Sequence, residues 1–206
     1  RPYGHGNYVV IKNLYPEDHP YNWTTIGELE DLQNATLEDV RSFYEKWYGP
    51  NNATMVIAGD IEKREVKKLV EKYFGEIKAG PDNGDPEPMP IELTETKKLY
   101  HEDNFASSPR LSMVFPTVDQ KHFDAPALEL LGQLMGDGKK APLYKVLVEE
   151  KKLAPNLYSY SGTQEIAGTF NIVVDGFPTS SLTDVEVAVH EAFVHFENES
   201  FTAEDL

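Results

Sequence analysis

Apolar residues recur at helical spacing in two stretches of the first part of the chain. Residues 36–49 start with Thr36 as a predicted N-cap, followed at the third helical position by Asp39, as in a capping box. Residues 63–75 form the second amphipathic stretch and end at a glycine that suits a helix C-cap. The run ATMVIAGD, residues 53–60, is short and strongly apolar, which predicts a buried strand. The expected local order is therefore helix, strand, helix.

The later part of the chain alternates paired strand patterns with paired helix patterns. The strands are predicted at residues 96–103, 110–118, 157–162 and 168–176. The helices are predicted at residues 123–136, 141–152 and 181–199. This order favours an α+β fold in two layers, with mostly antiparallel sheets covered by helices, over a doubly wound parallel fold.

Residues 80–93, GPDNGDPEPMPIEL, mark the sharpest change of composition. Four prolines, two glycines and four acidic residues prevent this stretch from continuing a helix or occupying a central strand. It is a predicted linker that divides the chain in two.

The charge balance restricts the possible partners. The 206 residues include 19 basic and 35 acidic side chains, so the net charge is −16. Such a chain has no surplus of cations for a nucleic-acid backbone, and anionic membrane surfaces repel it while cationic peptides are attracted. No apolar run is long enough to span a bilayer. The absence of cysteine excludes disulfides, thiolate catalysis and Cys-ligated zinc.

Both ends of the sequence suggest a piece of a longer protein. The chain starts at Arg1 without a methionine or a targeting pattern. At the other end, Thr202 is a predicted N-cap followed by acidic residues, and the sequence stops there.

The stretch HEAFVH, from His190 to His195, resembles a zinc-peptidase motif but has the wrong spacing. Five helical residues turn the chain by about 500°, so the two histidines point about 140° apart, whereas ligands at i and i+4 lie about 40° apart. We expect both histidines to flank the apolar face of a packing helix. His5, His19, His101 and His122 lie in unrelated segments, so the sequence predicts no histidine cluster.

Two further motifs carry little chemistry. Residues 136–144, GDGKKAPLY, resemble a phosphate-binding loop only loosely, lack its Gly-Lys-Ser/Thr ending, and are expected to join two helices. The pattern Asn-x-Ser/Thr occurs by chance in a chain without a secretory signal. Its four occurrences are Asn22, Asn34, Asn52 and Asn198.

A longer, ordered set of motifs resembles the insulinase/pitrilysin family of zinc peptidases, which includes the mitochondrial processing peptidase. The motifs are RPYG, HPY at His19 to Tyr21, Ile26-Gly27, Asp31-Leu32, YGPNNA at Tyr48 to Ala53, and Gly59-Asp60. Residues 127–154 resemble the family's helix, glycine loop and helix, and residues 168–176 the strand that follows. Each motif by itself is expected to build scaffold.

The resemblance implies that the metal site lies outside this chain. Family members bind zinc through the two histidines of H-x-x-E-H and a later glutamate, and these residues precede the PYG segment. We therefore expect zinc in the parent protein, bound upstream of Arg1, and assign no catalytic or metal-binding residue to this chain; its substrate-binding residues are unknown. Residues 1–79 are expected to form the C-terminal part of the first, catalytic-type domain, and residues 94–206 most of the second.

The resemblance also implies a peptidase with two halves that close around unfolded peptides or small proteins. The expected partners are peptide substrates and a second half or partner subunit. In many inactive halves an Arg and a Tyr contact the substrate; the matching positions here are Val148 and Pro155, which fits a catalytic-type half.

Three possibilities stay open at this point. The parent is either an active zinc metalloendopeptidase or a non-catalytic homologue, such as an assembly or partner subunit; a free-standing peptide-binding module is the third possibility. The lack of cysteine suits a bacterial periplasm or cytoplasm, which we favour, or an organelle, without deciding the compartment.

Overall fold

The computed structural model describes residues 2–199 and divides the chain into two compact units. One, which we call the sheet unit, takes the residues up to Thr24 and from Pro86 onward. The other, the helical unit, takes Thr25–Asp85. The sequence had placed residues 1–24 with the stretch before the linker, whereas the structure packs them with the sheet. The domain boundaries at residues 79, 80, 93 and 94 stay a prediction for the parent protein.

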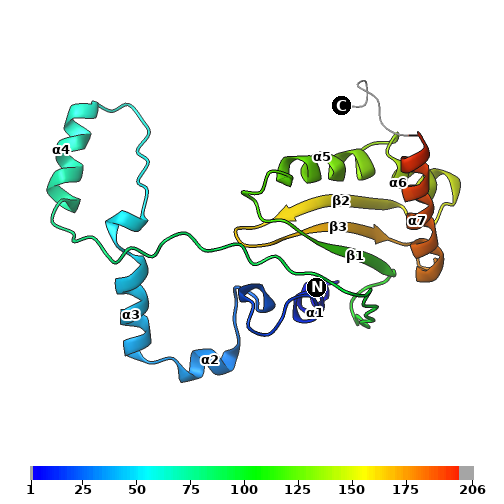
Figure 1. Ribbon diagram of the computed structural model, residues 1–206, viewed down its shortest axis with the longest axis horizontal. Helices are drawn as coiled ribbons and strands as arrows, with labels where there is room; N and C mark the ends of the chain where they lie inside the picture. Colours follow the sequence, from blue (N-terminus) through cyan, green and yellow to red (C-terminus); the bar gives the residue numbers. More distant parts are fainter. Residues whose placement is uncertain (1, 200–206) are drawn as a thin grey trace. The chain divides into compact units, whose positions relative to one another are not determined.

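A three-stranded antiparallel sheet forms the centre of the sheet unit (Figure 1). Its strands are β1 (Arg110–Thr117), β2 (Asn156–Thr163) and β3 (Gly168–Asp175), in the order β1-β3-β2. Leu111 and Leu157 both lie opposite Val174, which fixes the two registers. The antiparallel pairing, and the short turn that joins β2 to β3, confirm the expectation from the sequence.

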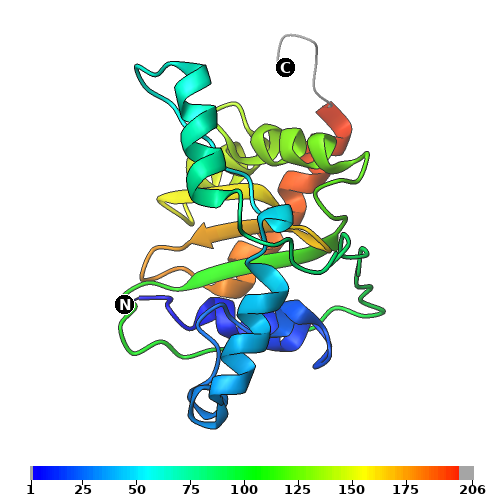
Figure 2. The same ribbon diagram turned by 90° about the vertical axis from the view of Figure 1, so that its left-hand side faces the viewer.

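Three helical segments pack with this sheet. They are α5 (Ala125–Gly136), α6 (Pro142–Tyr144), which continues into the π-helix η3 (Lys145–Glu150), and α7 (Leu182–Glu199). Figure 2 shows α7 passing behind the strands. All three lie where helical spacing predicted them, and the α+β class is confirmed.

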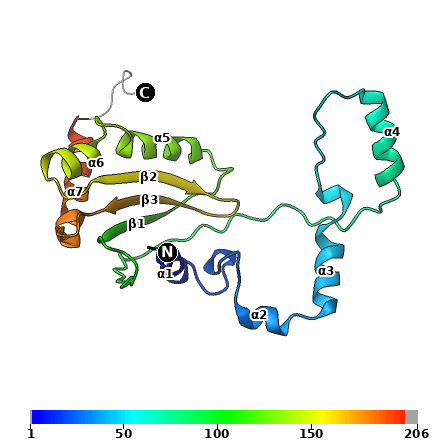
Figure 3. The same ribbon diagram turned by 180° about the vertical axis from the view of Figure 1, so that it is seen from behind.

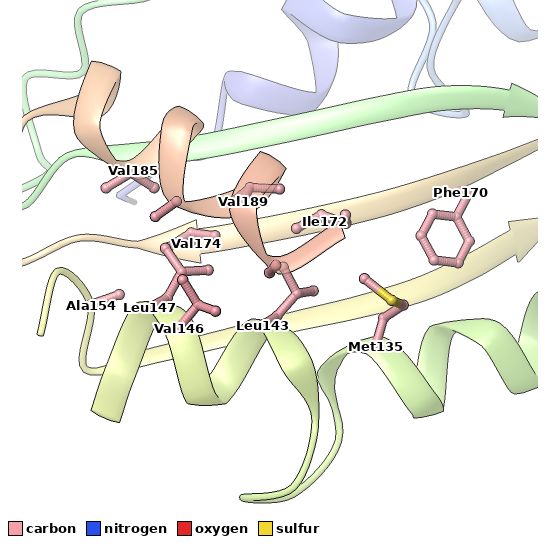
Figure 4. Close-up of a cluster of buried hydrophobic side chains, with 12 residues drawn as sticks. Met135, Leu143, Val146, Leu147, Ala154, Phe170, Ile172, Val174, Val185 and Val189 are labelled. Carbon is pink, nitrogen blue, oxygen red and sulfur yellow. The ribbon is translucent and has the colours of Figure 1, made fainter. Parts of the chain in front are cut away.

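The core lies between β3, α7 and the α6–η3 segment, where apolar side chains from all three point toward one another (Figure 4). Ile172 and Val174 of β3 meet Leu147 of η3 and Val185 and Val189 of α7, and all five are fully buried. Because β3 is the central strand, its residues from Phe170 to Val174 are buried without a break. Four of these five residues are apolar, so the sequence does not alternate; the exception is Asn171, whose Nδ2 donates to Thr169 Oγ1 at 2.9 Å.

The chain adopts a left-handed backbone conformation at the end of η3, and the residue there is not a glycine. Lys152 has φ 53°, and the amide of Leu153 donates to the carbonyl of Leu147 at 2.9 Å. The carbonyl of Leu153 then accepts from Phe177 N and from Ser180 Oγ. These bonds hold the segment after the π-helix against the approach to α7.

Two features of the sheet unit differ from the sequence prediction. Helix α1 (Gly6–Leu14) and the 3-10 turn η1 (Pro20–Asn22) were not anticipated. The strand predicted at residues 96–103 is wrong: among residues 2–199 this segment has no ladder partner, and side chains hold it instead. Lys98 Nζ, for example, binds Glu186 Oε1 at 2.7 Å.

The helical unit contains α2 (Leu29–Asn34), α3 (Leu37–Trp47), the 3-10 turn η2 (Pro50–Asn52) and α4 (Lys63–Phe74). Helices α3 and α4 appear where predicted (Figure 3). The capping box is complete, because Thr36 Oγ1 accepts from Asp39 N and Asp39 Oδ2 accepts from Thr36 N. Thr36 Oγ1 also donates to Asp39 Oδ2 at 2.7 Å, and this bond, followed by the bond from Thr36 N, lowers the pKa of Asp39.

The strand predicted at residues 53–60 is also wrong in this structure. The segment is extended, but none of its backbone groups bonds to another backbone group among the described residues. A strand exists only when a neighbouring strand supplies its hydrogen bonds. Within residues 25–85 no apolar side chain is buried, and Val56 of this segment is 84% exposed.

Candidate functional site

Helix α7 places the HEAFVH stretch on the flank of the core, as predicted. Val185, Val189 and Ala192 are buried, whereas His190 is exposed and His195 half-buried. The His190 ring meets Phe193 edge-on, with ring centroids 5.8 Å apart. The two histidines belong to the surface of a packing helix.

The glycine loop at residues 136–144 joins α5 to α6, as expected. Gly138 has φ 77°, a left-handed conformation that favours glycine, and Ala141 N donates to the Gly138 carbonyl at 3.3 Å. This loop acts as a connector between helices.

The HPY motif forms a buried aromatic cluster. His19 is 3% exposed and stacks on Tyr15, with ring centroids 4.6 Å apart. Its Nδ1 accepts from Tyr21 N at 3.0 Å, and its Nε2 lies 2.9 Å from the Met89 carbonyl. Since a carbonyl only accepts, Nε2 carries the proton. The backbone of His19 is extended, as the following proline predicted.

This cluster joins the N-terminal segment to the β2–β3 turn. Tyr21 Oη accepts from Ile166 N at 3.2 Å, and the Ile166 carbonyl accepts from Met89 N at 2.6 Å. Asn22 is buried and donates from Nδ2 to the Tyr15 carbonyl at 2.6 Å. This Asn22 amide is therefore engaged inside the fold.

The YGPNNA motif fastens the end of α3 to the linker. Asn51 Oδ1 accepts from Gly80 N at 2.7 Å, and Asn51 Nδ2 donates to the Gly80 carbonyl. Asn52 Nδ2 donates to the Trp47 carbonyl at 2.9 Å. A Cβ atom at Gly49 would lie 2.5 Å from Gly80 N, so the close approach requires glycine. The motif builds scaffold within the helical unit.

A tyrosine pair lies on the face of β2 opposite the core. Tyr158 and Tyr160 are 42% and 46% exposed, and their stacked rings have centroids 6.0 Å apart. Partial burial, and then the neighbouring Tyr158, raise the pKa of Tyr160. On the same face Arg110 donates to both carboxylate oxygens of Asp175, and its guanidinium lies 3.8 Å from the centroid of the Tyr3 ring.

Two histidines that the sequence placed in unrelated segments, His5 and His101, lie side by side. The rings of His5 and His101 have centroids 6.2 Å apart at an interplanar angle of 50°. Asp103 accepts from Tyr3 N at 2.6 Å and brings the two segments together. No local pattern connects residues so far apart in the sequence.

The described residues do not fit the family's catalytic zinc site. Residues 2–199 contain no group of three or more His, Cys, Asp or Glu side chains placed to hold a metal ion. Val148 lies in η3, and Pro155 lies in the segment before β2. Both side chains are apolar, so neither can bind a substrate through a polar group. No step of a peptidase reaction is assigned to these residues. Among the described helices, none is long and apolar enough to cross a membrane.

The family profile described as Peptidase M16 inactive domain matches residues 34–206. The chain belongs to the peptidase M16 family. This confirms the resemblance to the insulinase/pitrilysin peptidases. The predicted helix start at Thr202 falls within the matched range but lies outside the described residues.

Several curated M16 relatives carry the words zinc protease in their names. The zinc protease PqqE of Helicobacter pylori is 31% identical over 163 residues, which cover 78% of this chain and 36% of that protein. The uncharacterized zinc protease YmxG of Bacillus subtilis is 24% identical, over 92% of this chain and 45% of that protein. The chain thus spans less than half the length of these relatives.

Solved structures of M16 proteins share the fold. A protease from Helicobacter pylori matches with a TM-score of 0.71 and 27% identity, over 91% of this chain and 45% of that chain. Pitrilysin matches with a TM-score of 0.70 and 16% identity, over 98% of this chain and 22% of that chain. The second likeness concerns the fold alone.

Proposed function

We propose that this chain is part of a zinc-dependent metalloendopeptidase that hydrolyses unfolded peptides or small proteins. The match of residues 34–206 to the M16 inactive domain carries this proposal. The chain supplies scaffold and chamber wall, while the zinc ion is held by residues upstream of Arg1. A second half or partner subunit completes the chamber. The net charge of the chain, −16, favours cationic peptides as substrates.

The helical unit supports the idea that a domain is completed by the rest of the parent protein. Its helices α3 and α4 have apolar faces that nothing in residues 25–85 covers: Phe43 is 58% exposed and Leu69 51%. Between them, residues 53–60 are apolar, extended and unpaired. A segment with strong strand propensity between two uncovered helices is what remains when the other strands of a sheet are missing.

An activity assay tests whether the peptidase activity belongs to the parent protein and not to the 206-residue chain alone. We expect the 206-residue chain to leave an unstructured peptide intact, and the parent protein to cleave it until a zinc chelator is added. Chelator-sensitive cleavage by the 206-residue chain would contradict the upstream metal site. A parent without H-x-x-E-H that fails to cleave would instead support a non-catalytic homologue.

Hydrogen exchange tests the completion of the domain independently of activity. The amides of residues 54–58 should exchange freely in the 206-residue chain and become protected in the monomeric parent, because a neighbouring strand then binds them. The amides of β3 provide the internal control and should be protected in both proteins. Free exchange of residues 54–58 in the parent would exclude a strand there.

The alternative of a non-catalytic homologue has one specific support. The probable inactive metalloprotease YmfF of Bacillus subtilis is 22% identical over 98% of this chain and 46% of that protein. The parent would then act as an assembly or partner subunit with the same scaffold.

A further inference from the structure

We propose that His5 and His101 form a two-histidine site for a divalent transition metal ion such as Zn²⁺, Ni²⁺ or Cu²⁺. Both side chains are exposed, and their ring centroids lie 6.2 Å apart. Imidazole nitrogen suits these metals, and Cys ligands are absent from the chain. The site is separate from the zinc site proposed upstream of Arg1 and does not depend on it.

The distance between the rings allows one ion to bind both. Zinc lies about 2.0–2.1 Å from a ligating nitrogen, so it lies roughly 3 Å from the ring centroid. In tetrahedral coordination two ligating rings therefore have centroids roughly 5 Å apart. The observed separation is 6.2 Å, so the rings must approach each other by roughly 1 Å, which rotation of the two exposed side chains about their χ angles provides.

Neighbouring contacts hold the two segments together without the metal. Tyr3, two positions before His5, donates from its amide to Asp103 Oδ2, two positions after His101. Tyr3 Oη donates to the Ser108 carbonyl at 2.9 Å, and the Tyr3 ring lies over the Arg110 guanidinium. The histidines are thus placed side by side by bonds that neither ring makes, so metal binding requires little reorganisation.

Asp103 positions the site but does not complete it. Its Oδ1 accepts from the amides of Phe105 and Ala106, and its Oδ2 accepts from Tyr3. With both oxygens engaged by backbone donors, the carboxylate is a poor third ligand. Water completes the coordination, which agrees with the absence of a three-residue metal group among residues 2–199.

A bound ion would link the segment before α1 to the segment before β1. These segments are far apart in the sequence, and the two histidines come together only in the folded chain. An ion that binds only the folded arrangement raises the stability of the sheet unit. The site is therefore a structural clamp for the N-terminal segment.

Metal titration of the 206-residue chain, produced without a histidine tag, tests this site. With Zn²⁺, Ni²⁺ and Cu²⁺ as probes, we expect one ion per chain by calorimetry and a rise in Tm of the sheet unit. Either His5→Ala or His101→Ala should weaken binding by about a hundredfold, the low end of what a second tethered contact contributes. The double variant should lose less affinity than the sum of the two single losses, because either single change already removes the two-ligand contribution.

His122→Ala is the matched control, because it removes an exposed histidine elsewhere in the sheet unit. It should leave the affinity and the Tm shift unchanged. Broadening of the His5 and His101 ring signals by Cu²⁺ in NMR spectra should identify the ligands directly. The proposal is overturned if His122→Ala weakens binding as much as the pair variants, or if the losses at His5 and His101 are small and additive. Circular dichroism of each variant separates a lost ligand from a lost fold.

Discussion

Gly136 of α5 lies directly against the backbone of Ser159 in β2. A Cβ atom at Gly136 would lie 2.9 Å from Ser159 N and 2.5 Å from Ser159 Oγ. One turn earlier, Ser159 Oγ donates to the Gly132 carbonyl at 2.7 Å. This close approach sets how α5 packs on the sheet.

Substitution of Gly136 therefore tests the packing of α5. Gly136→Ala should lower the free energy of unfolding of the sheet unit by about 1–3 kcal/mol, the usual cost of an added methyl group in a full core. Gly6→Ala is the control: a Cβ there meets nothing within 4 Å, so the free energy should stay the same or rise slightly. Urea unfolding measures both. An unchanged free energy in Gly136→Ala would show that α5 can move away from β2.

The left-handed backbone at Lys152 predicts a stabilising substitution. A side chain in this conformation costs about 1–2 kcal/mol, partly offset by the greater freedom of glycine in the unfolded chain. Lys152→Gly should therefore raise the free energy of unfolding by about 0.5–1 kcal/mol. Lys151→Gly should lower it, because Lys151 has φ −88° and pairs with Glu191 at 2.6 Å. Equal effects of the two changes in thermal unfolding would contradict the assignment of strain to Lys152.

Substitutions of His19 should lower the free energy of unfolding by amounts that depend on which of its hydrogen bonds are lost. His19→Ala removes the acceptor for Tyr21 N and the partner of the Met89 carbonyl, and should cost about 1–3 kcal/mol for buried groups left without partners. His19→Asn should cost less, since an asparagine carbonyl can still accept from the amide two residues on. Chemical unfolding of both variants gives the comparison. A full loss in His19→Asn would mean that ring packing, rather than the Tyr21 bond, dominates.

Asp103 predicts an acid-dependent contact. Its backbone hydrogen bonds, the one from Phe105 first, lower the pKa of Asp103 below the usual value. A carboxylate whose pKa is lower in the folded state stabilises the fold above its unfolded pKa of about 3.9, and the stabilisation is lost as the pH falls through the folded pKa. NMR titration should show the Tyr3 amide shifting with the Asp103 carboxyl carbon, below pH 3.9. Asp103→Asn should remove the pH-dependent shift of the Tyr3 amide. Titration of the Asp103 carboxyl at or above pH 3.9 would contradict the lowered pKa.

The sequence predicted the elements whose pattern is local. Thr36 and Asp39 specify the start of α3 within one helical turn, and the spacing of apolar residues specified α5 and α7. The spacing of His190 and His195 also predicted that both histidines flank the apolar face of α7, where the structure places them. The ordered motifs also led to the M16 family, because each is a short stretch with its own backbone requirement.

The errors concern elements that depend on a partner elsewhere in the chain. Residues 53–60 have the composition of a strand, but pairing decides whether a strand forms, and no described residue pairs with them. Residues 96–103 bind α7 through Lys98 instead of joining the sheet.

Local sequence thus determined where α3, α4, α5 and α7 lie, the antiparallel β2–β3 turn and the motifs of the family, since these need only neighbouring residues. Tertiary structure alone decided that Gly136 contacts Ser159, that Asn51 binds Gly80, and that His5 meets His101. These contacts join distant segments, and their existence depends on how the whole chain folds rather than on any spacing that the sequence displays.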